Sequence, residues 1–215
     1  MKPELVLDLF CGAGGAAMGL HRAWPDAVII GVDIKPQPRY PFIFVQDDAM
    51  TFPLEGYDFI WASPPCQKYT AARTLQKREH ADLITPTRKR LMESGIPYVI
   101  ENVPGAPLLE PATICGLALG LNVKRHRLFE CSLPIDSTQC PKGHHGNWLI
   151  VFGWSALQRS NGAGTGPKKD RGKTKGKSVS HSEACNAMGI NWMKPTELSQ
   201  AIPPAYSQYI AEQLP

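Results

Sequence analysis

The tetrapeptide Pro64-Pro65-Cys66-Gln67 places a cysteine directly after residues 57–62, an apolar run that is typical of a buried strand. Two consecutive prolines cannot continue a strand, and they fix the backbone that carries the thiol. A thiol held on such a stiff turn suits nucleophilic attack. Buried cysteines are more often inert, so this interpretation depends on chemical partners elsewhere in the chain.

A glutamate and two arginines stand out as candidate partners elsewhere in the chain. Glu101 directly follows the apolar run 98–100, and Arg125 and Arg127 lie together further along the chain. Taken singly, each would usually be a satisfied surface group. A cysteine with its ordinary pKa of about 8.5 benefits from nearby cations, and Arg125 is the candidate for lowering the pKa of Cys66.

A second group of residues predicts a nucleoside site. Residues 8–15, DLFCGAGG, form a glycine turn that lets the backbone approach a ligand, although they do not match the dinucleotide fingerprint. Asp33 ends the next strand, where its carboxylate can accept hydrogen bonds from ribose hydroxyls. Asp48 could receive an adenine amine, and Ile34 offers an apolar face. Without any phosphate grip, the set fits S-adenosylmethionine better than NAD or ATP.

Alternating strands and helices must position these residues. Strands are expected at 5–10, 28–34, 42–45, 59–62 and 98–100, with a helix from the glycine turn to about residue 24. A second helix is expected to be capped by Thr85, to have Pro86 at its first position and to end at Gly95. This order predicts an α/β fold with a mostly parallel sheet and helices on both faces. Ligands of such sheets bind at the carboxyl ends of the strands, where every residue named above falls.

Composition narrows the class of protein. The 215 residues suffice for one domain with a substantial core. No apolar run reaches about 18 residues and no signal peptide is visible, so we expect a cytoplasmic protein without a membrane contact. Six cysteines without a regular framework fit free thiols in a reducing compartment.

The segment 159–177 is strongly basic. It holds seven basic residues against one acidic residue, a net charge of +6, which leaves −2 for the rest of a chain whose total is +4. The segment is also rich in glycine, so we expect a loop without a core of its own. It is either a solvated linker or an arm that contacts phosphates.

These motifs, in this order, resemble the cytosine-C5 DNA methyltransferase family. The resemblance covers residues 5–130 and resumes at 198–210, where Gln200-Ala201-Ile202-Pro203-Pro204 is similar to the last motif of that family. The shortness of the chain is similar to that of compact phage-encoded members, and restriction-modification, evasion of host defence and regulation are all compatible with the sequence as its purpose. The resemblance implies a Rossmann-like methyltransferase fold, double-stranded DNA as partner and S-adenosylmethionine as cofactor, and we expect a monomer.

The resemblance also implies a role for each residue. Cys66 would add to C6 of a flipped-out cytosine, Glu101 would bind N3 and the exocyclic amine, Arg127 would hold O2, and Arg125 would assist the thiolate. The base that removes the C5 proton is not identified, and water is an acceptor to consider. The cofactor-binding residues would be Phe10, Cys11, Gly12, Gly14, Gly15, Asp33, Ile34, Asp48, Ala49, Pro65, Gln200 and Ala201.

DNA contacts are expected from two segments. Residues 68–78 follow the nucleophile and are similar to the catalytic loop of the family, although an exposed polar loop is the alternative. The predicted DNA-binding residues are Gln67, Lys68, Arg73, Lys168, Lys169, Arg171 and Lys173. Lysine-rich loops favour contact with phosphates, so short or loose sequence selectivity is expected.

Two departures from the family pattern are visible. Gln200 stands where the last motif usually has an asparagine. The second and larger departure is the small size of the target-recognition region. The chain would divide into a catalytic and cofactor-binding part (1–130), a very small target-recognition region (131–190) and a C-terminal segment (191–215) that returns to the catalytic part. Within the small region, free thiols and surface histidines are the simpler interpretation, and a structural zinc held by Cys131, Cys140, His144 and Cys185 is the alternative.

Two other functions are compatible with the sequence. The same chemistry on RNA is the first, and a DNA-binding relative without turnover is the second. The presence of Cys66, Glu101, Arg125 and Arg127 together favours an active enzyme.

Overall fold

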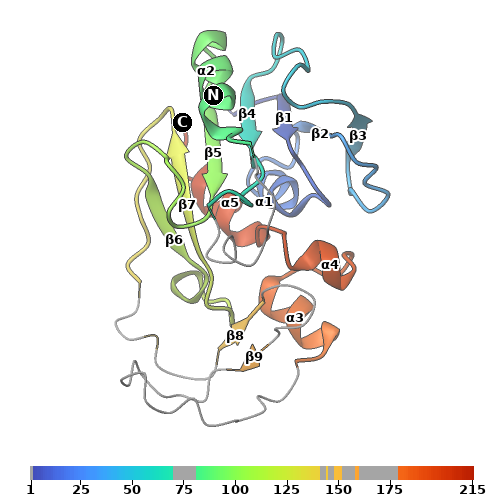
Figure 1. Ribbon diagram of the computed structural model, residues 1–215, viewed down its shortest axis with the longest axis vertical. Helices are drawn as coiled ribbons and strands as arrows, with labels where there is room; N and C mark the ends of the chain where they lie inside the picture. Colours follow the sequence, from blue (N-terminus) through green and yellow to red (C-terminus); the bar gives the residue numbers. More distant parts are fainter. Residues whose placement is uncertain (1, 70–80, 141–143, 145–147, 152–157, 160–178) are drawn as a thin grey trace.

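The structure is a computed structural model that describes residues 2–69, 81–140, 144, 148–151, 158–159 and 179–215. Within these residues, seven strands form one sheet in the order β3-β2-β1-β4-β5-β7-β6 (Figure 1). Neighbouring strands pair in parallel from β3 to β5, whereas β7 is antiparallel to both β5 and β6. The strands are β1 (Leu5–Leu9), β2 (Val28–Asp33), β3 (Ile43–Gln46), β4 (Phe59–Ala62), β5 (Tyr98–Asn102), β6 (Ala112–Cys115) and β7 (His126–Cys131). The mostly parallel sheet is therefore confirmed.

The central strands are buried on both faces, as expected for parallel strands covered by helices. In β4, the side chains of Phe59 and Trp61 enter one core, and those of Ile60 and Ala62 enter the other. This alternation explains why the segment has no polar position, because neither face of the strand meets water.

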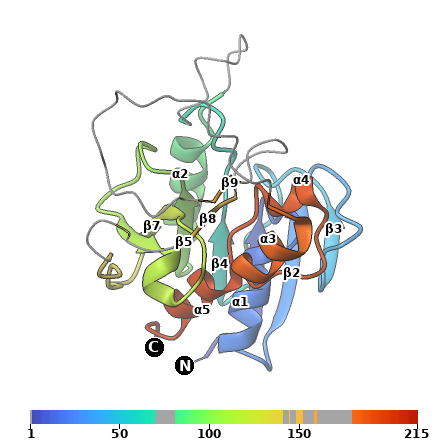
Figure 2. The same cartoon turned by 90° about the horizontal axis from the view of Figure 1, so that it is seen from below.

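Helices cover both faces of the sheet. The first helix, α1 (Gly15–Ala23), and the last, α5 (Pro204–Ala211), pack on one face, and α2 (Ile84–Ser94) packs on the other (Figures 1 and 2). The backbones of α1 and α5 cross closely at Gly19, where an added Cβ would lie 2.0 Å from the Pro204 carbonyl oxygen. The Ser207 hydroxyl donates to the Ala16 carbonyl across the same contact (2.7 Å). The C-terminal segment is thus fixed against the helix that follows β1.

The start of α2 differs from the sequence prediction. The helix begins at Ile84, and it is the Asp82 carboxylate, not Thr85, that accepts hydrogen bonds from the first-turn amides. The Thr85 hydroxyl instead donates to Asp82. Gly95 ends the helix in the left-handed conformation as predicted (φ 69°).

A third cluster of apolar side chains lies beside the sheet. It brings Val123, Leu149 and Val151 together with α3 (His181–Met188) and α4 (Pro195–Leu198). The Trp192 indole donates to the carbonyl of Ala13 in the glycine turn (2.8 Å). Short elements complete the described chain, namely η2 (Gly116–Leu119), β8 (Leu149–Ile150) and β9 (Gln158–Arg159).

The two ends of the chain lie close together in both views (Figures 1 and 2). In the part of the chain that the structure describes, every helix is too short or too polar to cross a membrane. Most of the basic segment 159–177 lies outside the described residues.

Candidate active site

Cys66 is held by contacts to the ends of three neighbouring strands. After β4, the Ser63 amide donates to the Leu9 carbonyl (3.1 Å), and the Asn102 side chain donates to the Pro64 carbonyl (2.8 Å). The Tyr69 amide then donates to the Cys66 carbonyl (2.9 Å) and closes a turn. Cys66 is half-buried. The thiol thus sits on a turn whose two sides are tied to β1 and β5.

Glu101 lies beside this turn in β5 and is almost completely buried (6% exposed). Its carboxylate forms an ion pair with the Nε of Arg127 (3.0 Å), and it accepts a hydrogen bond from the Ser63 hydroxyl. The Trp61 indole donates in turn to Ser63 (3.0 Å). Burial raises the pKa of Glu101, against the lowering effect of the two arginines. This carboxyl group is therefore suited to hold a proton that it can donate.

Arg125 is a buried cation whose position is fixed by the backbone around it. Its two terminal nitrogens donate to the carbonyls of Val151 (2.8 Å) and Ser199 (3.1 Å), which belong to the segments beside the sheet. Its Nε has no hydrogen-bond partner among the described residues. Burial, together with the charge of Arg127, lowers the pKa of Arg125 to about 9. The Nε of Arg125 is thus a buried donor without a partner in the described part of the chain, on a side chain whose charge acts on the Cys66 thiol.

The charges of Glu101, Arg125 and Arg127 all affect the pKa of the Cys66 thiol. Burial is the largest cause that raises its pKa, and the Glu101 carboxylate is the next. Arg127 and, more weakly, Arg125 lower the pKa, but the net result is a pKa above the ordinary value. The sequence predicted the direction of the effect of Arg125. It did not predict that burial and Glu101 outweigh the cations.

The glycine turn after β1 has the backbone of a ligand-binding loop. Phe10 adopts a left-handed conformation (φ 56°), which is uncommon for a residue with a side chain, and Gly12 (φ 49°) and Gly14 (φ 80°) follow it. The Asp33 carboxylate at the end of β2 accepts hydrogen bonds from the amides of Gly12 (3.1 Å) and Lys35 (2.9 Å). A Cβ added to Gly12 would meet nothing within 4 Å, so the space beside Gly12 is open, whereas a Cβ added to Gly14 would lie 2.6 Å from the side chain of Pro41.

The other predicted cofactor residues surround the same edge of the sheet. Ile34 is 65% exposed directly after Asp33, an unusual position for a large apolar side chain. Asp48 is exposed and accepts a hydrogen bond from the Met50 amide (2.8 Å), while its neighbour Ala49 is buried.

The C-terminal motif also reaches this edge. Gly15 lies against it, because an added Cβ would come within 2.2 Å of the Ile202 carbonyl oxygen. Cys11 is buried, Pro65 and Gln200 are exposed, and Ala201 is half-buried. The glycine turn and the C-terminal motif therefore lie side by side.

The residues predicted to bind DNA are only partly described. Gln67 is exposed and Lys68 is half-buried, both directly after Cys66. The Tyr69 hydroxyl donates to Asp82 (2.6 Å). The remaining predicted contacts fall outside the described residues, namely Arg73, Lys168, Lys169, Arg171 and Lys173.

The cysteines and histidines considered for a metal are not brought together as a set. Cys140 and His144 lie side by side, but Cys131 is at the far end of β7, paired with Val99. Cys185 contacts His181 within α3 instead (3.3 Å). The residues that lie close to Cys140 and His144 are Cys115 and His126, and not Cys131 and Cys185 as the sequence analysis considered.

Sequence reasoning also missed two residues that position the site, Ser63 and Asn102. Ser63 lies between Trp61 and Glu101, and Asn102 holds the turn that carries Cys66. Ser63 directly follows a predicted strand, and Asn102 directly follows Glu101. These positions could have indicated their role, because polar residues at the carboxyl ends of parallel strands lie at one edge of the sheet.

Comparisons with known proteins give the fold. No protein-family model and no curated protein matches the chain. A solved methyltransferase structure from Entamoeba histolytica covers 99% of this chain and 98% of its own, with a TM-score of 0.62 and 12% identity. The chain therefore has the Rossmann-like fold of methyltransferases.

Partial matches are also found. One is a Burkholderia thailandensis 1,6-didemethyltoxoflavin-N1-methyltransferase with bound S-adenosylhomocysteine (14% identity, TM-score 0.35, 52% of this chain and 49% of that one). Another is a Salinibacter ruber RNA methyltransferase with S-adenosylhomocysteine (15% identity, TM-score 0.34, 65% of this chain and 84% of that one).

Proposed function

We propose that this chain is an S-adenosylmethionine-dependent methyltransferase that modifies C5 of cytosine in double-stranded DNA. The observation that carries the proposal is the meeting of Cys66, Glu101 and Arg127 at the carboxyl edge of the sheet. Glu101 is a buried carboxyl group with a raised pKa, and it is paired with a cation near the Cys66 thiol. These groups together can activate a pyrimidine ring toward a nucleophile.

The glycine turn and its neighbours fit the adenosyl group of the cofactor. The Asp33 carboxylate would accept hydrogen bonds from the ribose hydroxyls, exposed Ile34 would offer an apolar face to the adenine, and the space beside Gly12 is open. Bound S-adenosylmethionine would supply an electrophilic methyl group. The turn lies at the end of β1, next to β4 and its Cys66 turn, so one ligand could reach both.

Cys66 and Glu101 would act on opposite sides of the ring. The Cys66 thiolate forms a bond to C6, and the electron pair of the C5–C6 double bond moves toward C5. Protonated Glu101 donates to N3, so the ring can accept this charge. Because Glu101 bearing a proton no longer raises the pKa of Cys66, binding of the base favours the thiolate.

The arginines would hold the charge that develops. Arg127 lies beside Glu101 and can donate to the O2 of the base, and the unpartnered Nε of buried Arg125 is a donor held near the thiol. The electron pair at C5 would bond to the methyl group as the bond between that group and the cofactor sulfur breaks, which leaves S-adenosylhomocysteine. The C5 proton would then leave to a base, for which water is a candidate, and N3 would return its proton to Glu101. The electron pair that the C5 proton leaves re-forms the double bond, and the Cys66–C6 bond breaks to release the thiolate.

The target base must leave the duplex for this chemistry, because C6 is otherwise inaccessible. Gln67 and Lys68 follow Cys66 directly and would contact the DNA. The basic segment 159–177 supplies charge for phosphate contacts.

A methyl-transfer assay tests the proposal. Purified protein is incubated with methyl-labelled S-adenosylmethionine and either duplex DNA or structured RNA. Label in duplex DNA that survives as 5-methylcytosine after hydrolysis is the expected result. Label in RNA alone would replace the proposal with the RNA reaction, and cofactor binding without label in either nucleic acid would indicate a relative without turnover.

Two variants provide the matched comparison. Cys66→Ser is expected to abolish transfer, whereas Cys131→Ser, a second half-buried thiol at the far end of β7, is expected to keep it. Equal transfer by the Cys66→Ser protein would remove the nucleophile from the proposal.

A further inference from the structure

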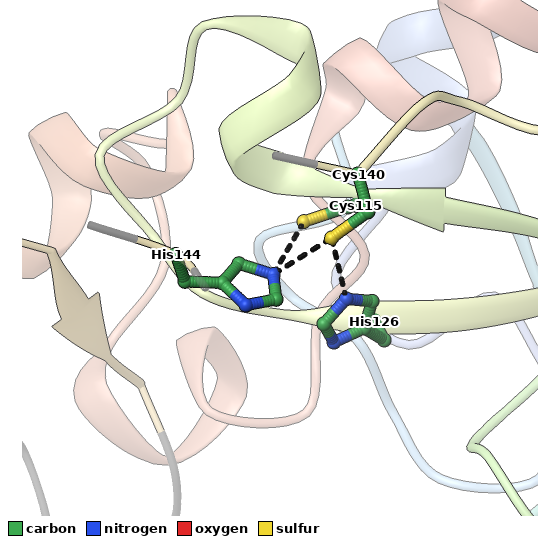
Figure 3. Close-up of side chains that lie close together, drawn as sticks. All are labelled: Cys115, His126, Cys140 and His144. Carbon is green, nitrogen blue, oxygen red and sulfur yellow. Dashed lines mark hydrogen bonds between the residues drawn. The ribbon is translucent and has the colours of Figure 1, made fainter. Parts of the chain in front are cut away.

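Four side chains that the proposed chemistry does not use form a compact group of two thiols and two imidazoles, at the end of β6 and the start of β7. Cys115, His126, Cys140 and His144 each offer one ligand atom, and these atoms all lie within 4.8 Å of one another (Figure 3). All four side chains point toward a common centre in Figure 3. Two sulfur and two nitrogen ligands in one cluster are a typical set for tetrahedral zinc.

The separations fit a small tetrahedron. Zinc bonds of about 2.3 Å to sulfur and about 2.0 Å to nitrogen place neighbouring sulfur and nitrogen ligands about 3.6 Å apart. Cys115 Sγ lies 3.6 Å from the Nε2 of His144, and Cys140 Sγ lies 3.3 Å from the Nε2 of His126. The contact between Cys140 and His144 is shorter (2.8 Å) and would open on binding. The two rings meet edge to face, with centroids 5.0 Å apart, so neither covers the other.

The backbone holds these ligands from two directions. Cys115 ends β6 and His126 begins β7, and they are directly paired in the antiparallel ladder. The following segment is tied to β6 by Thr138, whose amide donates to Thr113 (3.0 Å) and whose hydroxyl accepts from the Cys115 amide (2.9 Å). Cys140 therefore reaches the hairpin through contacts that do not involve its own side chain.

We propose that Cys115, His126, Cys140 and His144 bind one zinc ion as a closed structural site. Two thiolates balance the charge of the ion, so the site is neutral, which suits fully buried Cys115. The metal replaces the apolar core that so small a region would need to fix the segment after β7. His126 lies between Arg125 and Arg127, so the same ion also fixes the start of β7, which carries Arg127 and directly follows Arg125.

The zinc content of the untagged protein tests the proposal. The protein is purified without chelator, and its metal is measured by mass spectrometry and by release to a chromogenic chelator. We expect about one zinc ion per chain. Less than about half an equivalent after reconstitution with zinc would overturn the proposal. So would a Cys115–Cys140 disulfide, detected as two thiols lost to alkylation in the denatured, unreduced protein.

Variants test which residues are the ligands. Cys140→Ser is expected to lose most of the zinc. Cys185→Ser, which removes a thiol that contacts a single histidine of its own helix, is the matched control and should keep the ion. Equal zinc in both proteins would show that the cluster is not the site.

Cobalt substitution reports the ligands without relying on a damaging variant. Tetrahedral cobalt bound by two thiolates gives strong visible bands and a thiolate charge-transfer band. In Cys140→His, which keeps four possible ligands, the charge-transfer band should fall by about half while the tetrahedral bands persist. An unchanged charge-transfer band would contradict the assignment of Cys140, and a weak octahedral spectrum in the unmodified protein would contradict the whole site.

Discussion

The side chain of Asp8 should make the stability of the fold depend on pH. Asp8 lies in β1 and is 1% exposed, with one carboxylate oxygen accepting from the Tyr40 hydroxyl (3.2 Å). The other oxygen has no partner among the described residues. Burial raises the pKa of Asp8 to about 8, and the Tyr40 hydrogen bond offsets only part of that rise. The folded protein thus holds a proton that the unfolded chain releases at a much lower pH.

The sign and size of the effect follow from this difference in pKa. The proton stabilises the fold fully below the ordinary pKa of 3.8, and this stabilisation is lost as the pH rises toward about 8. At about 1.4 kcal/mol per unit of pKa, the whole span amounts to about 6 kcal/mol, and the part between about pH 5 and pH 7.5 to about 3 kcal/mol.

Asp8→Asn removes the titration and keeps the shape of the side chain. Urea unfolding of the variant and the unmodified protein at about pH 5 and pH 7.5 gives two differences in the free energy of unfolding. The variant should gain about 3 kcal/mol relative to the unmodified protein between the two values. Asp26→Asn, on an exposed carboxylate, should show no such gain. Parallel pH dependence of the Asp8→Asn and unmodified proteins would refute the reasoning.

Three further perturbations give direct tests. Glu101→Gln should lower the pKa of Cys66, because it removes a neighbouring negative charge. Alkylation of the Cys66 thiol should then begin at lower pH, although methyl transfer is lost. An alkylation profile that is not shifted along the pH axis would contradict the predicted coupling between the two residues. Gly19→Ala should lower the free energy of unfolding, measured in urea, by about 2 kcal/mol. The clash of the new methyl group with α5 outweighs a helix-propensity gain of about 1 kcal/mol. A variant more stable than the unmodified protein would show that α1 and α5 can move apart without cost. Arg88→Met should lower the free energy of unfolding by about 3 kcal/mol, because it leaves the buried Glu130 carboxylate without its cation. Adding Glu130→Gln should recover part of that loss. Equal stability of the single and double variants would argue against the ion pair.

The parallel half of the sheet could be predicted because its signals are local. The strands around Leu7 and Ile60 are apolar runs ended by glycine or proline, and the predicted bounds agree with the structure to within a residue or two. The start of α2 was wrong because both Asp82 and Thr85 can cap a helix, and only the tertiary placement of Asp82 decides between them.

The antiparallel strands escaped prediction because their signals are not local. The strand β7 contains Arg127 and Glu130, which suggest an exposed segment in the sequence. Both are largely shielded from water, because each pairs with a charge on another element, Arg127 with Glu101 and Glu130 with Arg88. The pairing of Cys115 with His126 has the same origin, since strand register brings together residues with no recognisable metal-ligand spacing.

The central claim, that Cys66 attacks C6 of a cytosine, is tested most directly by trapping the covalent intermediate. Duplex DNA containing 5-fluorocytosine is incubated with the protein and S-adenosylmethionine, because a fluorine at C5 cannot leave as the proton does and the Cys66–C6 bond then persists. A denaturation-resistant protein–DNA complex is expected, with the modified nucleotide mapped by mass spectrometry to the peptide that contains Cys66. An adduct on another cysteine, or no adduct under conditions in which ordinary DNA is methylated, would contradict the account.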